Sequence, residues 1–293
     1  MDKLIFEYEK RKDRILTDHV SYLTTLKNTG FNPKVIYDIG SCILHWYNSA
    51  RLVFPDARYI VFDANPELEP LYKSLNLEYY ITVLSNCTDT VNYYNSIDNV
   101  DCIGGNGIYP EINLLWTDIQ KTSSVITETI SDIITKNGLP LPDLVKIDVQ
   151  GAELQIVEGS GTNFDNAILL CEFPRFNYNL FVFDVCYSLE KMKVDGWNCI
   201  KHLFSDNGFD GDYAFSKTIP SEITNVCPES VLVLYETDSN GIPSGKFKSF
   251  EYFIKFIKFY DIKKYDDLFQ TYQDKFTGKI LTVDDIKSRM KTN

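Results

Sequence analysis

The chain has 293 residues, of which 44% are hydrophobic and 14% aromatic, so a globular protein is expected rather than a disordered one. Its formal net charge is -12 and basic residues form no long run, which argues against nucleic acid and anionic membranes as partners. No apolar stretch reaches the ~20 residues of a membrane span, and the first residues lack a signal-peptide core. We therefore expect a cytoplasmic protein.

Cysteine and histidine usage argues against metal and disulfide chemistry. The seven cysteines are scattered and none has C-x-x-C spacing, so buried, reduced thiols are expected. Three histidines are too few for a histidine-rich metal site, and we predict no metal ligands. His19 is expected on a helix face, and His45 and His202 are expected to be structural.

The N-terminal residues predict a helix. Apolar side chains recur at helical spacing from residue 3 to about residue 28, and Gly30 and Pro33 end the pattern. One leading helix, packed on the core, is therefore expected within residues 1–33.

The next stretch predicts the central strand of the fold. The apolar run from Val35 to Ile39 ends at Gly40, and apolar residues from Cys42 onward indicate the first helix of the core. Open α/β sheets bind ligands at the carboxyl ends of their strands. A dinucleotide needs the spaced glycines of G-x-G-x-x-G, so Gly40 alone favours a nucleoside without phosphates, such as S-adenosylmethionine.

A second carboxylate supports a nucleoside site. Asp63 closes the apolar run 58–63 and follows Asp38 at close to the roughly 20-residue offset of a ribose-binding acid. The alternative is that Asp38 and Asp63 are ordinary residues at strand ends.

Strand and helix patterns alternate up to residue 217, which predicts one doubly wound α/β domain over residues 34–217. The glycine-rich, aromatic stretch 95–122 is expected to form a lid or substrate wall, or else a plain insertion. Residues 218–293 are expected to form a mixed, mainly helical extension, which would pack on the core, cover the cleft or mediate a homo-oligomer. Strands are expected at 58–63, 78–84, 91–94, 144–149, 167–173, 197–203, 213–216 and 231–235, and helices at 66–75, 124–136, 152–158, 183–193, 250–260, 265–276 and 282–290.

Six segments carry a family resemblance. In chain order they read KVIYDIGS, RYIVFDANPE, ITVLSN, DLVKIDVQGAELQIVEGS, ILLCEF and GDYAFSK. This series resembles the FkbM family of S-adenosylmethionine-dependent methyltransferases over roughly residues 34–217. The GGNGIYPE stretch at 104–111 also resembles a loop of some members. The family pattern K-I-D-x-E-G-A-E with a later glycine is matched at Lys146, Ile147, Asp148, Gly151, Ala152, Glu153 and Gly159, with Gln150 in place of the usual acid.

The resemblance implies a Rossmann-like sheet of seven mostly parallel strands, with the last strand antiparallel. It also implies methyl transfer to a hydroxyl of a sugar, a glycan or a related small molecule. One departure is Leu44, where the family commonly has glycine; we expect Leu44 to lie inside the first helix. Carried over by position, the cofactor would contact Asp38, Gly40 and Ser41 at its methionine end, Asp63, Ala64 and Asn65 at its ribose, and Leu84 and Ser85 at its adenine.

The acceptor hydroxyl needs a group that takes its proton. Asp148 and Glu172 end neighbouring strands and Glu153 follows one turn into a helix, so these three are the expected catalytic residues, with Asp148 preferred. The alternatives are that Glu153 caps its own helix and that Glu172 pairs with Arg175. Binding of Mg²⁺ by Asp148 and Glu172 is a less favoured possibility. The acceptor is expected to contact Asn106, Tyr109 and Glu111.

Two other hypotheses about the function remain open. The fold is a silent binding or assembly module that has lost its cofactor, or it is an enzyme that modifies nucleotide sugars. Gly40 alone argues against the pyrophosphate of a nucleotide sugar. Retention of both Asp38 and Asp63 favours an active enzyme over a module, because a scaffold needs neither acid.

Overall fold

The computed structural model describes residues 3–95, 104–109, 121–174, 179, 185–204, 210–220, 235–237 and 243–247. The chain divides into two compact units, Met1–Pro228 and Glu229–Asn293. In the second unit the described residues form one antiparallel pair, β11 (Tyr235–Thr237) with β12 (Pro243–Phe247). The helices expected between residues 250 and 290 lie outside the described residues, as does most of the stretch 95–122.

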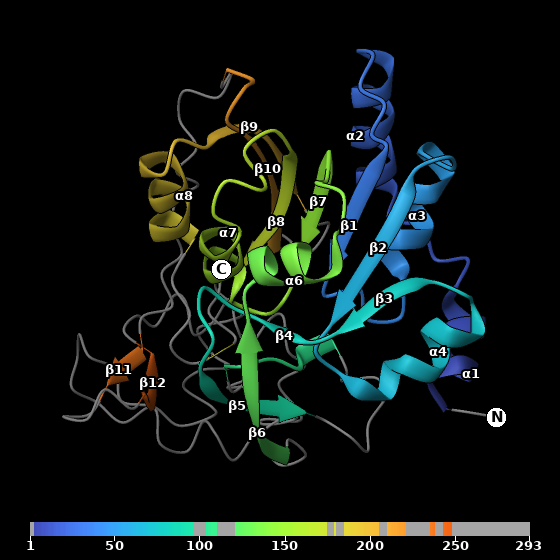
Figure 1. Ribbon diagram of the computed structural model, residues 1–293. Coiled ribbons are helices and arrows are strands. Elements are labelled where there is room, and N and C mark those ends of the chain that lie inside the picture. The colour runs from blue at the N-terminus through green and yellow to red at the C-terminus, as the bar shows by residue number, and fades with distance from the viewer. Residues whose placement is uncertain are drawn as a thin grey trace, which may run out of the picture. The chain divides into compact units, whose positions relative to one another are not determined.

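A seven-stranded sheet forms the centre of the first unit, in the order β3-β2-β1-β7-β8-β10-β9 (Figure 1). β10 is antiparallel to both of its neighbours, and the other pairs along the sheet are parallel. The expected fold class, with an antiparallel last strand, is therefore confirmed. The strands are β1 (Val35–Ile39), β2 (Arg58–Asp63), β3 (Glu78–Ile81), β7 (Leu144–Ile147), β8 (Ile168–Pro174), β9 (Asn198–Phe204) and β10 (Asp210–Ser216).

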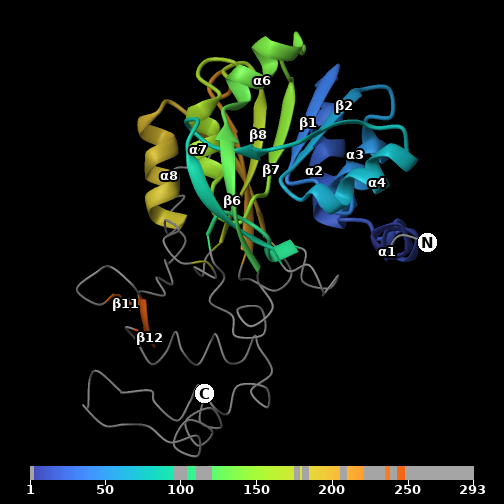
Figure 2. The ribbon, with the colours of Figure 1, turned by 60° about the horizontal axis from the view of Figure 1, so that its bottom comes forward.

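Helices cover both faces of this sheet (Figures 1 and 2). Successive strand residues point to opposite faces, so Ile36 packs with residues of α2 and α3, whereas Tyr37 packs with residues of α6, α7 and α8. Both layers exclude water from the sheet, as a parallel sheet requires. The helices are α1 (Lys3–Arg11), α2 (Thr17–Asn28), α3 (His45–Val53), the 3-10 turn η1 (Pro66–Leu68), α4 (Glu69–Ser74), α6 (Ile130–Asn137), α7 (Glu153–Gly159) and α8 (Val185–Val194).

The N-terminal region differs from the expectation of one helix. It forms α1 and α2, with a break whose last residue, Leu16, donates its backbone N–H to Ser49 Oγ at 2.9 Å. Apolar spacing continues across the break, so the periodicity alone did not reveal it. The break matters because it brings residues 14–19 over the sheet edge described below.

The prediction that Leu44 lies inside the first helix was wrong. Leu44 has φ 69° and Cys42 has φ 46°, and neither value fits a right-handed helix. α3 begins only at His45. The side chain of Leu44 is fully buried, which outweighs the backbone cost of the left-handed conformation.

The prediction of one helix over residues 124–136 was wrong for its first part. That part belongs to β6 (Lys121–Glu128), which pairs antiparallel with β5 (Thr90–Asn95) and parallel with β4 (Val83–Leu84). α6 begins after Thr129, whose side chain accepts the N–H of Asp132 at 3.0 Å. This N-cap was the available sequence signal. The strand predicted at 78–84 is likewise divided into β3 and β4 at Thr82.

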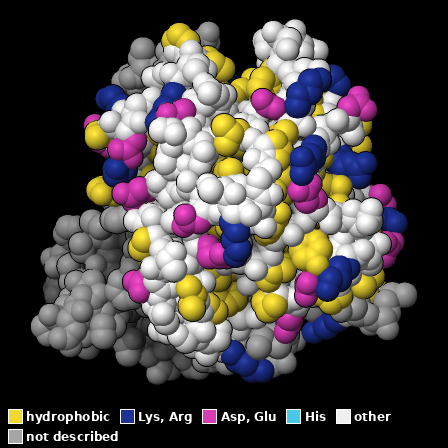
Figure 3. Space-filling view, in the orientation of Figure 1, with side chains coloured by type: hydrophobic (Ala, Val, Ile, Leu, Met, Phe, Trp, Pro, Cys, Tyr) yellow, Lys and Arg dark blue, Asp and Glu magenta, His cyan; other side chains and the backbone are white. Residues whose placement is uncertain are grey.

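No helix within the described residues is both long and apolar enough to cross a bilayer. On the described part of the face in Figure 3, acidic and basic side chains are interspersed and form no broad basic area.

Candidate functional site

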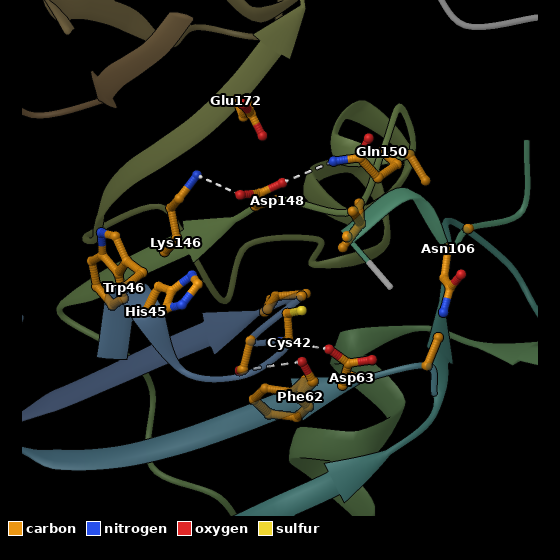
Figure 4. Close-up of a pocket in the computed structure, with 18 of the residues that line it drawn as sticks. Cys42, His45, Trp46, Phe62, Asp63, Asn106, Lys146, Asp148, Gln150 and Glu172 are labelled. Atoms are coloured by element: carbon orange, nitrogen blue, oxygen red, sulfur yellow. Dashed lines mark hydrogen bonds and ion pairs between the residues drawn. The ribbon is translucent and has the colours of Figure 1, made fainter. Parts of the chain in front are cut away.

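A cavity of about 730 Å³ lies where β1, β2 and β7 end (Figure 4). Its walls come from the turn after β1, the end of β2, β4, the ends of β7 and β8, and the start of β10. Residues 14–19, between α1 and the first turn of α2, also contribute to the lining, as do the start of α3 and residues 104–108. The cavity therefore lies at the carboxyl-end position predicted from the sequence.

Gly40 permits the close packing of two strand ends. It has φ +82°, and a Cβ added to it would overlap the backbone carbonyl oxygen of Asp148, beyond the end of β7. Its N–H donates to the carbonyl oxygen of Phe62 at 2.9 Å. Gly40 is thus required by the packing of β1 against β7, independently of any ligand.

Asp63 lines the cavity at the end of β2. Its carboxylate accepts the backbone N–H of Cys42 at 2.8 Å and that of Asn65 at 2.9 Å. Burial raises the pKa of Asp63 to about 6, although these hydrogen bonds act to lower it. Ala64 also lines the cavity, whereas the side chain of Asn65 is buried and caps η1 by accepting the N–H of Glu67.

Asp38 lies behind the turn and does not line the cavity. Burial raises the pKa of Asp38 to about 7, and the Lys146 ammonium only partly opposes this. Its Oδ2 atom has no hydrogen-bond partner among the described residues. Ser41 does line the cavity, and its hydroxyl donates to the carbonyl oxygen of Asp38 at 2.6 Å.

Of the other expected binding residues, some line the cavity and some do not. Leu84 and Asn106 line the cavity, and Asn106 donates its side-chain N–H to Asn95 Oδ1 at 2.9 Å. Ser85 lies outside the lining and packs against Gly159. Tyr109 is also outside, and its hydroxyl accepts a hydrogen bond from Gln155. Glu111 lies outside the described residues.

Asp148 follows β7 and lines the cavity with Glu172 of β8 (Figure 4). Asp148 Oδ2 is 3.4 Å from the Lys146 ammonium, and its Oδ1 accepts the Gln150 side-chain N–H at 3.3 Å. The side chain of Asp148 is 35% exposed, so it remains accessible to a molecule in the cavity. Gln150, which replaces the usual acid of the motif, keeps a polar contact with Asp148.

Glu153, the third expected catalytic residue, does not reach the cavity. Its Oε1 accepts the backbone N–H groups of Val149 and Gly151, each at 3.1 Å, and the residue is 3% exposed. Burial raises the pKa of Glu153 to about 7 against the effect of these hydrogen bonds. Glu153 therefore holds the loop that enters α7, whereas the alternative stated from the sequence was that it caps its own helix. The alternative for Glu172 involves Arg175, which lies outside the described residues.

An ionic chain that the sequence did not predict borders the cavity. Lys146 is 3% exposed, and its ammonium lies 2.6 Å from Asp212 Oδ1 as well as near Asp148. Asp212 Oδ2 is 2.8 Å from His19 Nε2, and His19 Nδ1 accepts the indole N–H of Trp46 at 3.2 Å. A lysine between the buried residues Val145 and Ile147 was the one local signal, because a buried ammonium needs a partner.

Opposite charges keep Lys146 protonated and Asp212 deprotonated. Burial alone would lower the pKa of Lys146, but the facing carboxylates of Asp148 and Asp212 raise it well above its ordinary value. Burial likewise acts to raise the pKa of Asp212, and the Lys146 ammonium together with the His19 hydrogen bond lowers it well below its ordinary range. The lysine and Asp212 therefore form an ion pair at neutral pH.

His45 also lines the cavity, as the first residue of α3. Burial, and then the nearby guanidinium groups of Arg14 and Arg11, lower its pKa, so the imidazole is neutral at pH 7. Its Nε2 atom has no hydrogen-bond partner among the described residues. His45, expected to be structural, is thus a further group that is able to accept a proton.

Metal ligands are not grouped in the part of the chain that the structure describes: no three His, Cys, Asp or Glu side chains there are placed to hold one ion.

Comparison with known families gives one match in sequence. The profile of the Methyltransferase FkbM domain matches residues 38–192. No curated protein matches the chain.

Comparison with solved structures gives several similar chains. Methyltransferase FkbM from Methylobacillus flagellatus KT is 13% identical with TM-score 0.40, covering 71% of this chain and 57% of that one. A SAM dependent methyltransferase from Aquifex aeolicus is 10% identical with TM-score 0.37, covering 72% and 97%. The SAH-bound Podospora anserina methyltransferase PaMTH1 is 14% identical with TM-score 0.35, covering 74% and 88%. The chain thus spans little more than half the length of the Methylobacillus protein.

Proposed function

Because the chain belongs to the FkbM methyltransferase family, whose profile covers more than half of its residues, we propose that it is an S-adenosylmethionine-dependent O-methyltransferase. The proposed acceptor is a hydroxyl of a sugar, a glycan or a related small molecule. The observation that carries the proposal is one cavity with Asp63 and the Gly40 turn at one end and Asp148 with Lys146 at the other.

The residues at the β1–β2 end fit the cofactor. A cavity of about 730 Å³ is large enough for a nucleoside together with a small acceptor. Asp63 carries a carboxylate at the end of β2, where the ribose-binding acid of a nucleoside fold lies, and no ion pair joins it to a described lysine or arginine. The turn at Gly40 and Ser41 would hold the methionine end, and Leu84 offers an apolar surface to the adenine.

When bound, S-adenosylmethionine supplies a methyl group on a positively charged sulfur, so the protein mainly has to position the acceptor and remove its proton. Asp148 is the preferred proton acceptor, because it is accessible in the cavity and held by Lys146 and Gln150. Glu172 and the neutral imidazole of His45 are the other candidates in the lining.

The departures from the family pattern do not favour the silent module. Leu44 keeps a left-handed backbone, φ 69°, which is the conformation that glycine adopts easily. The turn therefore keeps the path of a glycine-containing loop. Gln150 donates a hydrogen bond to Asp148 and so still orients that carboxylate.

Calorimetric titration of S-adenosylmethionine into the wild type, Asp63→Ala and Asp56→Ala tests the cofactor. Asp56 is an exposed carboxylate in the turn before β2 and serves as the control. We expect micromolar binding to the wild type and to Asp56→Ala, and binding roughly 100-fold weaker to Asp63→Ala, since hydrogen bonds to a charged group contribute about 1.5–3 kcal/mol. Thermal melting checks that each variant is folded. Absence of binding to the wild type at millimolar cofactor would contradict the proposal.

Transfer of labelled methyl groups to a panel of neutral, acidic and amino sugars then tests the acceptor. Asp148→Asn should lower kcat by roughly 10²–10⁴-fold, the usual contribution of a general base, with unchanged affinity for the cofactor. If the protein methylates only amino groups, the proposal of an O-methyltransferase is wrong and the protein is an N-methyltransferase.

A further inference from the structure

A continuous row of polar contacts leads from the N-terminal helix α2 to Asp148. Trp46 donates to His19, His19 lies 2.8 Å from Asp212, and the Lys146 ammonium lies 2.6 Å from Asp212 and 3.4 Å from Asp148. All five side chains belong to residues that line the cavity. The row therefore connects the expected proton acceptor with a helix at the start of the chain.

The direction of each hydrogen bond in this row follows from the donors. An indole N–H only donates, so His19 Nδ1 must carry the lone pair. The proton of neutral His19 then lies on Nε2, which donates to Asp212 Oδ2. Asp212 accepts on both oxygens, from His19 and from Lys146, and is held at two points.

The sheet explains why Lys146 depends on Asp212. Lys146 of β7 is paired with Leu170 of β8, and Leu170 with Ala214 of β10, so these three side chains share one face. Asp212 lies two residues from Ala214 on the same face, toward the cavity. The Lys146 side chain reaches across β8 to Asp212, and this ion pair is shorter than the one with Asp148. The position of the ammonium beside Asp148 is thus set by where Asp212 is held.

We propose that His19 is a positioning residue of the methyl-transfer site: through Asp212 it holds the Lys146 ammonium against Asp148. The catalytic part of this inference rests on the function proposed above. His19 and Asp212 both lie outside the residues 38–192 matched by the family profile, so they extend the site beyond the matched domain.

Two variants separate the hydrogen bonds of His19. His19→Gln places an amide N–H near the position of Nε2 and keeps a donor for Asp212. His19→Asn is one carbon shorter, so its amide lies near the position of Nδ1, where it meets Trp46 and does not reach Asp212. Both changes remove the same ring from the same buried position and introduce a neutral amide, so a merely structural role predicts similar effects.

The first measurement needs no acceptor. The ¹⁵Nζ–H signal of a buried, hydrogen-bonded lysine exchanges slowly with water, and Lys146→Met assigns it. We expect this signal in the wild type and in His19→Gln, and its loss in His19→Asn. A signal that persists equally in both variants would overturn the proposal.

The second measurement is the rate of methyl transfer. His19→Asn should lower kcat by roughly 10- to 100-fold, since a displacement of about 1 Å at a reacting group costs up to 10²-fold, and His19→Gln should restore most of the rate. Affinity for S-adenosylmethionine should be unchanged in both variants. Equal rates in the two variants would overturn the catalytic role. Failure of the wild type to bind the cofactor would instead refute the proposed function, and a difference in the lysine signal would still support the hydrogen-bond chain.

Discussion

Aspartates at the two ends of the site, in the cavity lining or buried directly behind it, are in opposite electrostatic states. At the β1–β2 end, burial raises the pKa of Asp38 to about 7 and that of Asp63 to about 6, and no ion pair joins either residue to a described lysine or arginine. At the β7–β10 end, the Lys146 ammonium lies between Asp148 and Asp212, and the pKa of Asp212 is well below its ordinary range.

The two ends differ in whether the protein itself supplies a counter-ion for the carboxylates. The β7–β10 end contains its own counter-ion and is complete without a ligand. At the β1–β2 end, burial disfavours the charged form of the carboxyl of Asp63, which lines the cavity, so a ligand that brings positive charge or hydroxyl donors is stabilised there. A sulfonium nucleoside has both properties, which agrees with the proposed cofactor.

Removal of the Lys146 ammonium, which distinguishes the β7–β10 end from the β1–β2 end, should have the largest effect on stability. Lys146→Met leaves Asp212 buried without its cation, and we expect the free energy of unfolding to fall by about 3–5 kcal/mol. Lys191→Met is the matched control, because the Lys191–Asp195 pair has the same 2.6 Å separation but lies at the surface. That change should cost less than about 1 kcal/mol in the same urea titration. Equal losses would show that Lys146 is not held as an ion pair in the interior.

Gly40→Ala tests the contact between the two ends. A methyl group there overlaps the Asp148 carbonyl oxygen and also meets an unfavourable φ, so we expect a loss of more than about 2 kcal/mol. Gly138→Ala, at φ +62° with open space around it, should cost only about 1 kcal/mol. If thermal melting gives the same loss for both, the strand ends are able to separate without cost.

A third test concerns pH. A carboxyl whose folded pKa is raised binds its proton more tightly in the folded state, so its contribution to stability is lost as pH rises from about 4 to about 7. Asp38→Asn should reduce this slope by no more than about 1.4 kcal/mol per pH unit. Asp56→Asn, which removes an exposed carboxylate, is the matched control. Asp212 acts in the opposite sense, because its stabilisation is lost on acidification.

The fold was largely predictable because its strands are local patterns. The apolar runs of β1, β2, β7 and β8, each followed by a polar residue or glycine, identify the sheet and the edge where the cavity lies. The start of α6 was missed because the isoleucines of β6 and α6 also fit one continuous helical face, and only the cap at Thr129 separates them.

The site was only partly predictable: Asp148 and Glu172 were expected at the ends of β7 and β8 and line the cavity, whereas the partners of Lys146 were not predicted. Gly40 and Asp63 lie in motifs whose spacing carries information, and both line the cavity. His19 and Asp212 come from opposite ends of the first unit, and no local pattern relates them before the strand order is known. Glu153 shows the converse: it matches the family motif, yet its carboxylate is used by backbone N–H groups.

The direction of β10 has a consequence for how the protein is made. Because β10 runs against its neighbours, its first residues lie at the edge where β7 and β8 end, and this places Asp212 at the cavity. During translation His19 leaves the ribosome early, whereas Asp212 follows only after β9. Until then the Lys146 side chain lacks its nearer carboxylate. A nascent chain that ends before β10 should therefore stay open at this edge and be a better substrate for proteases and chaperones than the completed domain.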